Sequence, residues 1–74
     1  MHFAPGIMDT VDVIHPDYGE IGFLQQAINS KKYEFWPKQQ YDIGLTVQDL
    51  VDIGLKMREL ERAVENRPEE NLPF

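Results

Sequence analysis

The chain has 74 residues, a formal net charge of −6 and no cysteine. This length allows one domain with a thin core, and the absence of cysteine excludes disulfide bonds and thiolate metal sites as its support. With these excluded, oligomerisation or docking on a larger protein is the expected support. The negative charge argues separately against binding to phosphate groups.

The first sixteen residues predict an extended N-terminal arm. Pro5 and Gly6 indicate a turn, and Val11 and Val13 alternate with a polar residue as in a short strand. A strand of this domain and an arm that lies over a neighbouring chain fit the pattern equally well.

Residues 17–29 predict a first helix. Asp17 and Glu20 stand at the spacing of a capping box. The apolar residues that follow keep helical spacing, at Ile21, Leu24 and Ile28. An alternative places a short β-hairpin near residues 11–23, with the PDYG stretch as its turn.

An aromatic and basic segment, KKYEFWPKQQY, occupies residues 31–41. Its first lysines suit the C-terminal end of the preceding helix, and Pro37 would end any short strand formed by YEFW. The aromatic side chains could fill the core between two helices, stack nucleobases or dock on another protein. All three roles stay open at this point.

The strongest predicted element is a helix over residues 47–66. Thr46 can cap it, and Asp49 completes an arrangement like a capping box. A heptad-like apolar seam follows one face, at Leu50, Ile53, Met57, Leu60 and Val64. A second apolar strip accompanies the first half only, at Val47, Val51 and Leu55. We therefore expect the first half of the helix to be buried on two sides and the second half on one.

Together these elements predict a mainly α-helical single domain. Its expected parts are an arm (1–16), a helix (about 17–29), the extended aromatic segment, a helix (about 47–66) and a tail (67–74). The alternative is a small α+β fold that contains the short β-hairpin near residues 11–23.

The titratable residues predict neither an enzyme nor a metal or cofactor site. Only His2 and His15 can supply imidazole, and no second ligand stands at a metal-site spacing from either. The sequence also lacks a glycine-rich phosphate loop and a recognisable pairing of a nucleophile with a base. A chain of this length is further expected to have difficulty enclosing a pocket of about 300 Å³ or more.

Protein–protein interaction is the function that the sequence favours. Aromatic and methionine side chains are typical interface anchors, and so short a chain is expected to carry more apolar surface than one copy can bury. We expect a small acidic protein that self-associates or binds a larger protein, with the profile of an accessory subunit, a phage-type inhibitor or a virion component. The expected contact residues are Tyr33, Phe35, Trp36, Ile53, Met57, Leu60 and Val64.

The alternative function is a dimeric nucleic-acid-binding regulator or an antitoxin-type protein that reads nucleic acid through Lys31, Lys32 and Lys38. The net charge argues against it. A membrane is not expected as a partner, since no run of about 18 apolar residues is present. A small-molecule substrate is not expected either, because so short a chain has difficulty enclosing a pocket. The N-terminus also lacks the basic and apolar regions of a signal peptide, so a cytoplasmic location is expected.

Overall fold

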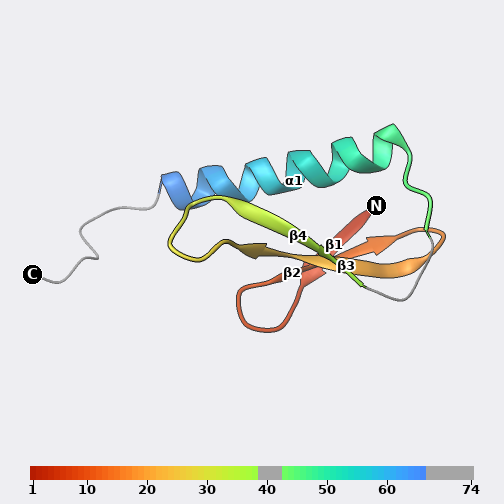
Figure 1. Ribbon diagram of the computed structural model, residues 1–74, viewed down its shortest axis with the longest axis horizontal. Coiled ribbons are helices and arrows are strands. Elements are labelled where there is room, and N and C mark those ends of the chain that lie inside the picture. The colour runs from red at the N-terminus through yellow and green to blue at the C-terminus, as the bar shows by residue number, and fades with distance from the viewer. Residues whose placement is uncertain (39–42, 67–74) are drawn as a thin grey trace, which may run out of the picture.

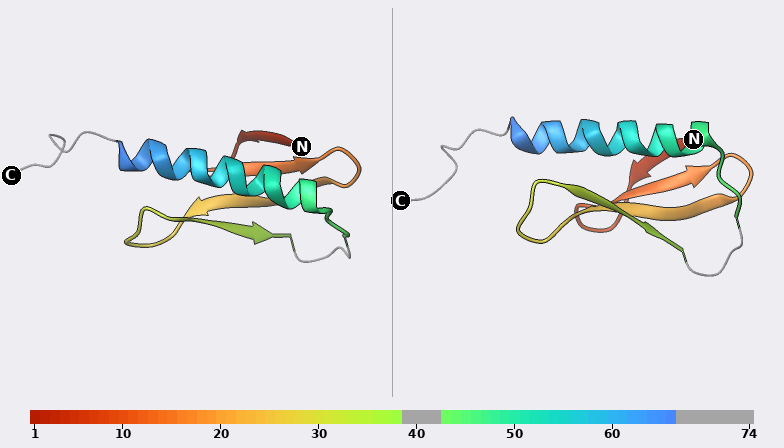
Figure 2. Two further views of the ribbon diagram at one scale, coloured as in Figure 1. Left: turned by 90° about the horizontal axis from the view of Figure 1, so that it is seen from above. Right: turned by 45° about the horizontal axis from the view of Figure 1, so that its top comes forward.

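The computed structural model describes residues 1–38 and 43–66, so the predicted tail at 67–74 lies outside the described residues. Within them, the chain forms four strands and then a helix: β1 His2–Pro5, β2 Val11–His15, β3 Gly19–Gln26, β4 Tyr33–Pro37 and α1 Val47–Glu65. The strands make one antiparallel sheet in chain order. Figure 1 and Figure 2 show α1 lying along one face of this sheet, so the domain has two layers.

The predicted mainly α-helical fold is wrong, and so is the description of the chain as helical. Residues 17–29 contain no helix, because β3 takes up most of this range. The alternative α+β fold is closer, since β2 and β3 pair as an antiparallel hairpin whose turn is formed by residues 16–18 of the PDYG stretch. The range predicted as an arm contains β1 and β2, which pair with each other inside this domain.

A β-bulge in β3 explains why this strand resembles a helix in the sequence. Val13 pairs with Gly22 but Ile14 pairs with Glu20, so Ile21 is one residue more than β2 can match. Such an extra residue shifts the alternation of side chains along a strand. Ile21 and Leu24, three residues apart, are therefore both buried in the core, which reproduces the spacing expected of a helix.

Gly22 makes the close pairing of β3 with β4 possible. A Cβ atom at this position would overlap the carbonyl oxygen of Trp36 and would stand 2.8 Å from a ring carbon of Phe35. Only a residue without a side chain fits there. The pairing of β3 with β4 thus requires a glycine at position 22.

The core lies between the sheet and α1. Its buried apolar residues come from β2, β3 and α1, and they are Val13, Ile21, Leu24 and Ile53. Half-buried side chains pack around them, with Phe3 from β1, Phe35 from β4 and Met57 and Leu60 from α1. All four strands and the helix therefore contribute to one small core.

The predicted helix at 47–66 is present as α1, and its start is capped as the sequence indicates. The backbone N–H of Asp49 donates to Thr46 Oγ1 at 3.1 Å, and the backbone N–H of Thr46 donates to Asp49 Oδ2 at 2.9 Å. These two bonds satisfy donors that a helix start otherwise leaves free. At the other end, the N–H of Asn66 donates to the carbonyl oxygen of Arg62 at 3.0 Å.

Candidate protein-interaction surfaces

Five of the seven predicted contact residues belong to the core of the domain or pack against it. Ile53 is buried, and Met57 and Leu60 pack beside it on the sheet. Tyr33 and Phe35 reach the same core from β4, while Val64 is half-buried near the end of α1. Ile53, Met57 and Leu60 of the seam therefore pack on the sheet of their own chain, whereas Leu50 at its start is 55% exposed. A role of the predicted contact residues in binding a second protein stays a prediction.

Trp36, the remaining predicted contact residue, faces away from the core. It is the direct cross-strand partner of Phe23, just as Phe35 is the partner of Leu24. Direct partners project on the same side of a sheet and successive residues on opposite sides. Because Leu24 and Phe35 point toward α1, Trp36 and Phe23 stand on the face that α1 leaves uncovered, which we call the open sheet face.

The open sheet face has an aromatic centre. The Phe23 and Trp36 rings are stacked, with 6.5 Å between their centroids and 10° between their planes. The side chain of Trp36 is 49% exposed. The same row of cross-strand partners continues through Asp12 on β2 to Ala4 on β1, so the row runs from the aromatic pair to a carboxylate.

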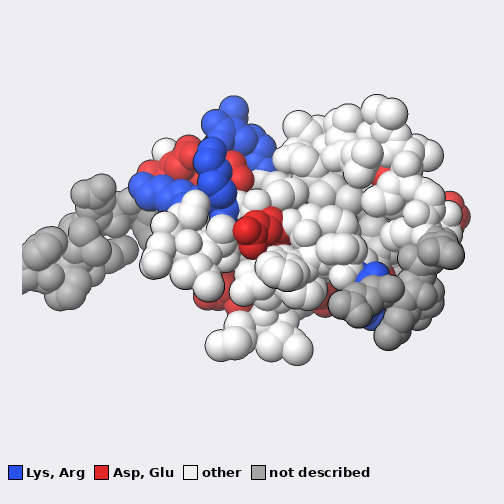
Figure 3. Space-filling model, viewed as in Figure 1, with Lys and Arg blue, Asp and Glu red and all other residues white. Residues whose placement is uncertain are grey.

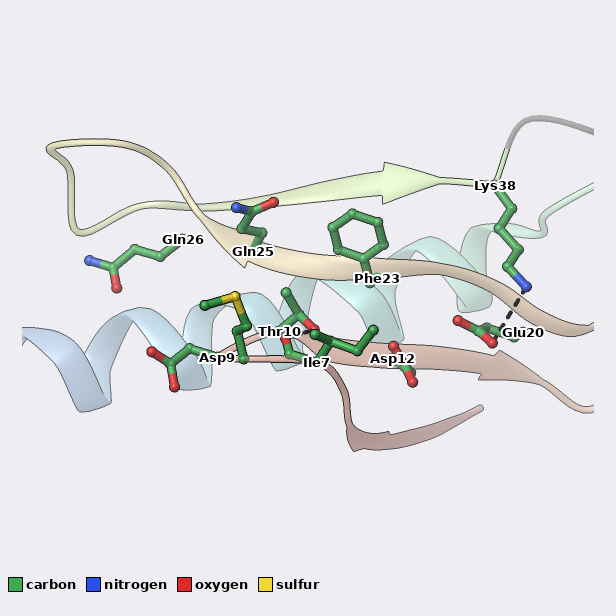
Figure 4. Close-up of a pocket in the computed structure, with 10 residues that line it drawn as sticks. Ile7, Asp9, Thr10, Asp12, Glu20, Phe23, Gln25, Gln26 and Lys38 are labelled. Carbon is green, nitrogen blue, oxygen red and sulfur yellow. Dashed lines mark hydrogen bonds and ion pairs between the residues drawn. The ribbon is translucent and has the colours of Figure 1, made fainter.

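A hollow of about 670 Å³ lies on this face beside Phe23. Figure 4 shows Phe23 between the β1–β2 loop on one side and the start of β3 with Lys38 on the other. Ile7 and Met8 in the loop line the hollow and are 82% and 91% exposed. The hollow is larger than expected for so short a chain, because it is an open depression over the sheet.

The β1–β2 loop that carries Ile7 and Met8 is held by its own hydrogen bonds. The N–H of Gly6 donates to the carbonyl oxygen of Thr10 at 2.9 Å, and Thr10 Oγ1 donates to the carbonyl oxygen of Ile7 at 2.7 Å. Met8 has a φ of 57°, in the left-handed region that favours glycine. The turn that Pro5 and Gly6 predict lies at the start of this loop, whereas Phe23 falls within the helix predicted at 17–29, because the extra residue in β3 hides the alternation of a strand.

Negative charge surrounds the hollow. Its lining includes the carboxylates of Asp9, Asp12 and Glu20, and in the described part of the chain its only cation is Lys38. Lys38 Nζ lies 3.4 Å from Glu20 Oε1, as the dashed line in Figure 4 marks. This ion pair offsets one carboxylate and leaves the charges of Asp9 and Asp12 uncompensated by a lining residue.

A second apolar surface covers the outer side of α1. Its large side chains are Val47 (78% exposed), Leu50 (55%), Val51 (43%) and Leu55 (65%). We call this set, with Gly54 between them, the α1 outer stripe. Figure 3 shows uncharged atoms over the N-terminal half of α1 and charged ones over its C-terminal half. The expectation that this half of the helix is buried on two sides is wrong for the single chain, since Val47, Val51 and Leu55 of the second strip are exposed.

The outer edge of β4 is partly blocked. The N–H of Lys38 points toward β3, where it donates to the carbonyl oxygen of Ile21 at 2.8 Å, so the alternate positions 33, 35 and 37 face outward. The N–H of Tyr33 donates to Glu61 Oε2 at 2.9 Å, and Pro37 has no N–H. Only the N–H of Phe35 is left to pair with an added strand on this edge.

His15 and Asp49 form a part-buried polar contact between the sheet and α1. His15 is 6% exposed, and its Nε2 lies 3.1 Å from Asp49 Oδ2. Its Nδ1 accepts the N–H of Asp17 at 3.0 Å, so the ring hydrogen sits on Nε2 and is donated to Asp49. Both ring nitrogens are engaged within the fold, and the pair joins the end of β2 to the start of α1.

Two carboxylates that tie α1 to the sheet have lowered pKa values. The backbone N–H of Thr46 holds the pKa of Asp49 below its ordinary value, and the hydrogen bond from His15 acts in the same direction. The backbone N–H of Tyr33 lowers the pKa of Glu61, with help from Lys32 and Arg58. Both contacts therefore favour the charged carboxylate in the folded protein.

Comparisons of the chain with protein-family models, curated proteins and solved structures give no match. Among the described residues, His, Asp and Glu side chains nowhere form a group of three that could hold a metal ion. No helix in the same part of the chain has both the length and the hydropathy that crossing a membrane requires.

Proposed function

We propose that this chain is a small acidic, non-enzymatic protein-interaction protein that self-associates or binds a larger protein. The observation that supports this function is the α1 outer stripe, whose four large apolar side chains are between 43% and 78% exposed. Burying an exposed Val or Leu side chain fully stabilises a complex by about 1.5–3 kcal/mol. Each of the four side chains would contribute part of this stabilisation to a complex in which a partner covers the stripe. Accessory subunits, phage-type inhibitors and virion components are roles that fit such a protein.

Gly54 supports a helix as the element that covers the stripe. A Cβ atom there would meet nothing within 4 Å, so the fold of this chain does not require a glycine. In a helix interior, glycine is less favourable than alanine by about 1 kcal/mol. A small residue in the middle of an apolar stripe does, however, let another backbone approach closely.

The alternative of nucleic-acid binding gains little support from the positions of the three lysines. Lys31 and Lys32 stand in the turn before β4, and Lys38 follows its other end, about 20 Å away at the rise of a strand. Lys38 is also paired with Glu20. A titration with DNA and RNA at low salt tests this alternative, because phosphate contacts are strongest there.

The test of the proposed function is the mass of the particle in the native lysate and after purification. The wild-type chain should run above its monomer mass of 8.6 kDa, either with itself or with a bound protein. The double variant Val51→Gln/Leu55→Gln removes apolar surface from the stripe while keeping a good helix former, and it should run as the monomer. Ala63→Gln, at an exposed position of the same helix, is the matched control and should behave as wild type.

A wild-type chain that runs at 8.6 kDa in both preparations would contradict the proposed function. If the double variant still runs above its monomer mass, the contact lies at a surface other than the stripe. The proposal keeps the cytoplasmic location that the sequence favours, and fractionation of the producing cells tests it.

A further inference from the structure

The open sheet face is built like one side of a buried layer, but no helix or strand of the described residues covers it. A sheet face that carries large apolar side chains is normally packed against another element. Here the stacked pair of Phe23 and Trp36 stands on that face, with Trp36 half exposed. Ile7 and Met8 project beside it from a loop that is fixed by hydrogen bonds. Phe23 forms the apolar floor of the hollow and Ile7 and Met8 form one wall, while Trp36 extends the apolar surface beside Phe23.

The charges around this apolar floor indicate the sign of the partner. Asp9 and Asp12 lie on the β1–β2 side of the hollow, and Glu20 is already paired with Lys38. Figure 4 shows Asp9 and Asp12 on either side of the apolar residues of the loop. Carboxylates at the rim of an apolar site favour a partner with positive groups at matching places. A second copy of this chain is unsuitable, because two open sheet faces would bring like charges together.

The backbone at the edge of the sheet indicates how the partner lies. The N–H of Tyr33 donates to Glu61 and Pro37 has no N–H, so among the described residues only the N–H of Phe35 can pair with a strand added to the outer edge of β4. The addition of a strand at this edge is therefore disfavoured. The hollow, in contrast, has a volume within the range of about 300–1,000 Å³ that is typical of ligand sites, so an element can lie across the face and insert side chains into it.

We propose that the open sheet face binds a cationic amphipathic helix of a partner protein. The apolar side of that helix packs on Phe23 and Trp36 and against Ile7 and Met8. Its lysine or arginine side chains extend from the apolar side and reach the carboxylates of Asp9 and Asp12. This site is separate from the α1 outer stripe, since the two surfaces lie on opposite layers of the domain.

The probe for this site is a synthetic amphipathic helix of leucine and lysine, titrated into the full chain at low and high salt. A peptide of the same length made of leucine and glutamate is the control for the peptide. Trp36 is the only tryptophan of the chain, so its fluorescence reports on the open sheet face alone. The leucine–lysine peptide should shift the Trp36 emission to shorter wavelengths and bind more weakly as salt rises. The leucine–glutamate peptide should leave the emission unchanged.

Two variants with equal net charge separate a specific site from general attraction to an acidic protein. Asp9→Asn/Asp12→Asn removes the two carboxylates of the hollow, and Asp52→Asn/Glu59→Gln removes two from α1. The first variant should weaken peptide binding by about fivefold more than the second, since each exposed ion pair contributes up to about 1 kcal/mol. Far-ultraviolet circular dichroism checks that both variants are folded.

Two results would overturn the proposal. One is an equal loss of affinity in the two charge variants. The other is a Trp36 emission that stays unchanged while a labelled leucine–lysine peptide is fully bound. The stripe variant Val51→Gln/Leu55→Gln should bind the peptide as wild type does, so failure at this site is distinguishable from failure of the proposed association through α1.

Discussion

The two faces of the sheet differ in what they bury. On the face toward α1, Val13 and Leu24 are completely buried and Ile21 nearly so. On the open face, Trp36 keeps half of its surface in solvent, although it neighbours Phe35 of the core along the same strand. Both faces carry large apolar residues, but only one has a layer packed on it. Apolar residues on the first face therefore stabilise the fold, whereas Trp36 on the second face stays in contact with solvent.

The largest expected effect is the loss of a core side chain from β3. Leu24→Ala should lower the free energy of unfolding by about 2–5 kcal/mol, because it removes buried methyl groups and leaves a cavity. Ile28→Ala is the matched control, since Ile28 is 87% exposed and should change stability by about 0.5 kcal/mol or less. Urea unfolding followed by circular dichroism measures both, and equal changes would contradict the assignment of Leu24 to the core.

A pair of glycine variants should change stability in opposite directions. Gly22→Ala should destabilise the protein by about 1–3 kcal/mol, because its Cβ has no room beside the backbone of β4. Gly54→Ala should stabilise it by up to about 1 kcal/mol, because the position lies in a helix and is open. Thermal unfolding of the two variants is the measurement. A Gly22→Ala variant as stable as wild type would refute the pairing of β3 with β4 in this register.

Acid should weaken the attachment of α1 to the sheet. Asp49 and Glu61 have pKa values below their ordinary values in the folded protein, so the folded state binds fewer protons than the unfolded state. Their contribution to stability is therefore present above the ordinary values of 3.8 and 4.5 and is lost as the pH falls through the lowered pKa values. Urea midpoints measured from about pH 7 down to about pH 3 should decrease most steeply below about pH 5.

The variant Glu61→Gln sharpens the acid prediction. It keeps an acceptor near the N–H of Tyr33 but removes the titrating group, so the decrease in stability toward low pH should be shallower than in wild type. Glu34→Gln, on an exposed residue of β4, is the control. Identical pH profiles for wild type and Glu61→Gln would contradict the role given to Glu61.

Two neighbouring residues on β4 should differ in their effect on stability, because they lie on opposite faces of the sheet. Trp36→Ala should destabilise the protein by about 1 kcal/mol, chiefly through its lost stacking on Phe23. Phe35→Ala, one residue away on the core side, should cost about 3 kcal/mol. Guanidinium unfolding of the two variants gives the comparison directly. If Trp36→Ala proves the more destabilising of the two, the assignment of faces along β4 is reversed.

The parts of the fold that were predicted correctly are those with local causes. The capping residues Thr46 and Asp49 and the apolar seam after them predict α1 from neighbouring residues alone. The β2–β3 hairpin is the alternative that the sequence leaves open. The sequence favours a helix there because the bulge at Ile21 places Ile21 and Leu24 at helical spacing. The preference for a helix is therefore explained by one extra residue in a strand.

The candidate surfaces depend on pairings between distant residues, so the sequence could indicate them only in part. The sequence predicts Trp36 as a contact residue and a second apolar strip on the helix, but it does not show which face of the domain each occupies. For Trp36, the answer comes from its register with Phe23. For the seam, it comes from a sheet that supplies the partner surface on which Ile53, Met57 and Leu60 pack.

The accessibility of Trp36 to a neutral quencher, acrylamide, tests the division between the two sheet faces most directly. In the folded chain at low concentration, the indole should be readily quenched and emit at long wavelength, because half of its surface is exposed. A folded chain whose single tryptophan is shielded from acrylamide and emits at short wavelength, without any partner present, would contradict the account.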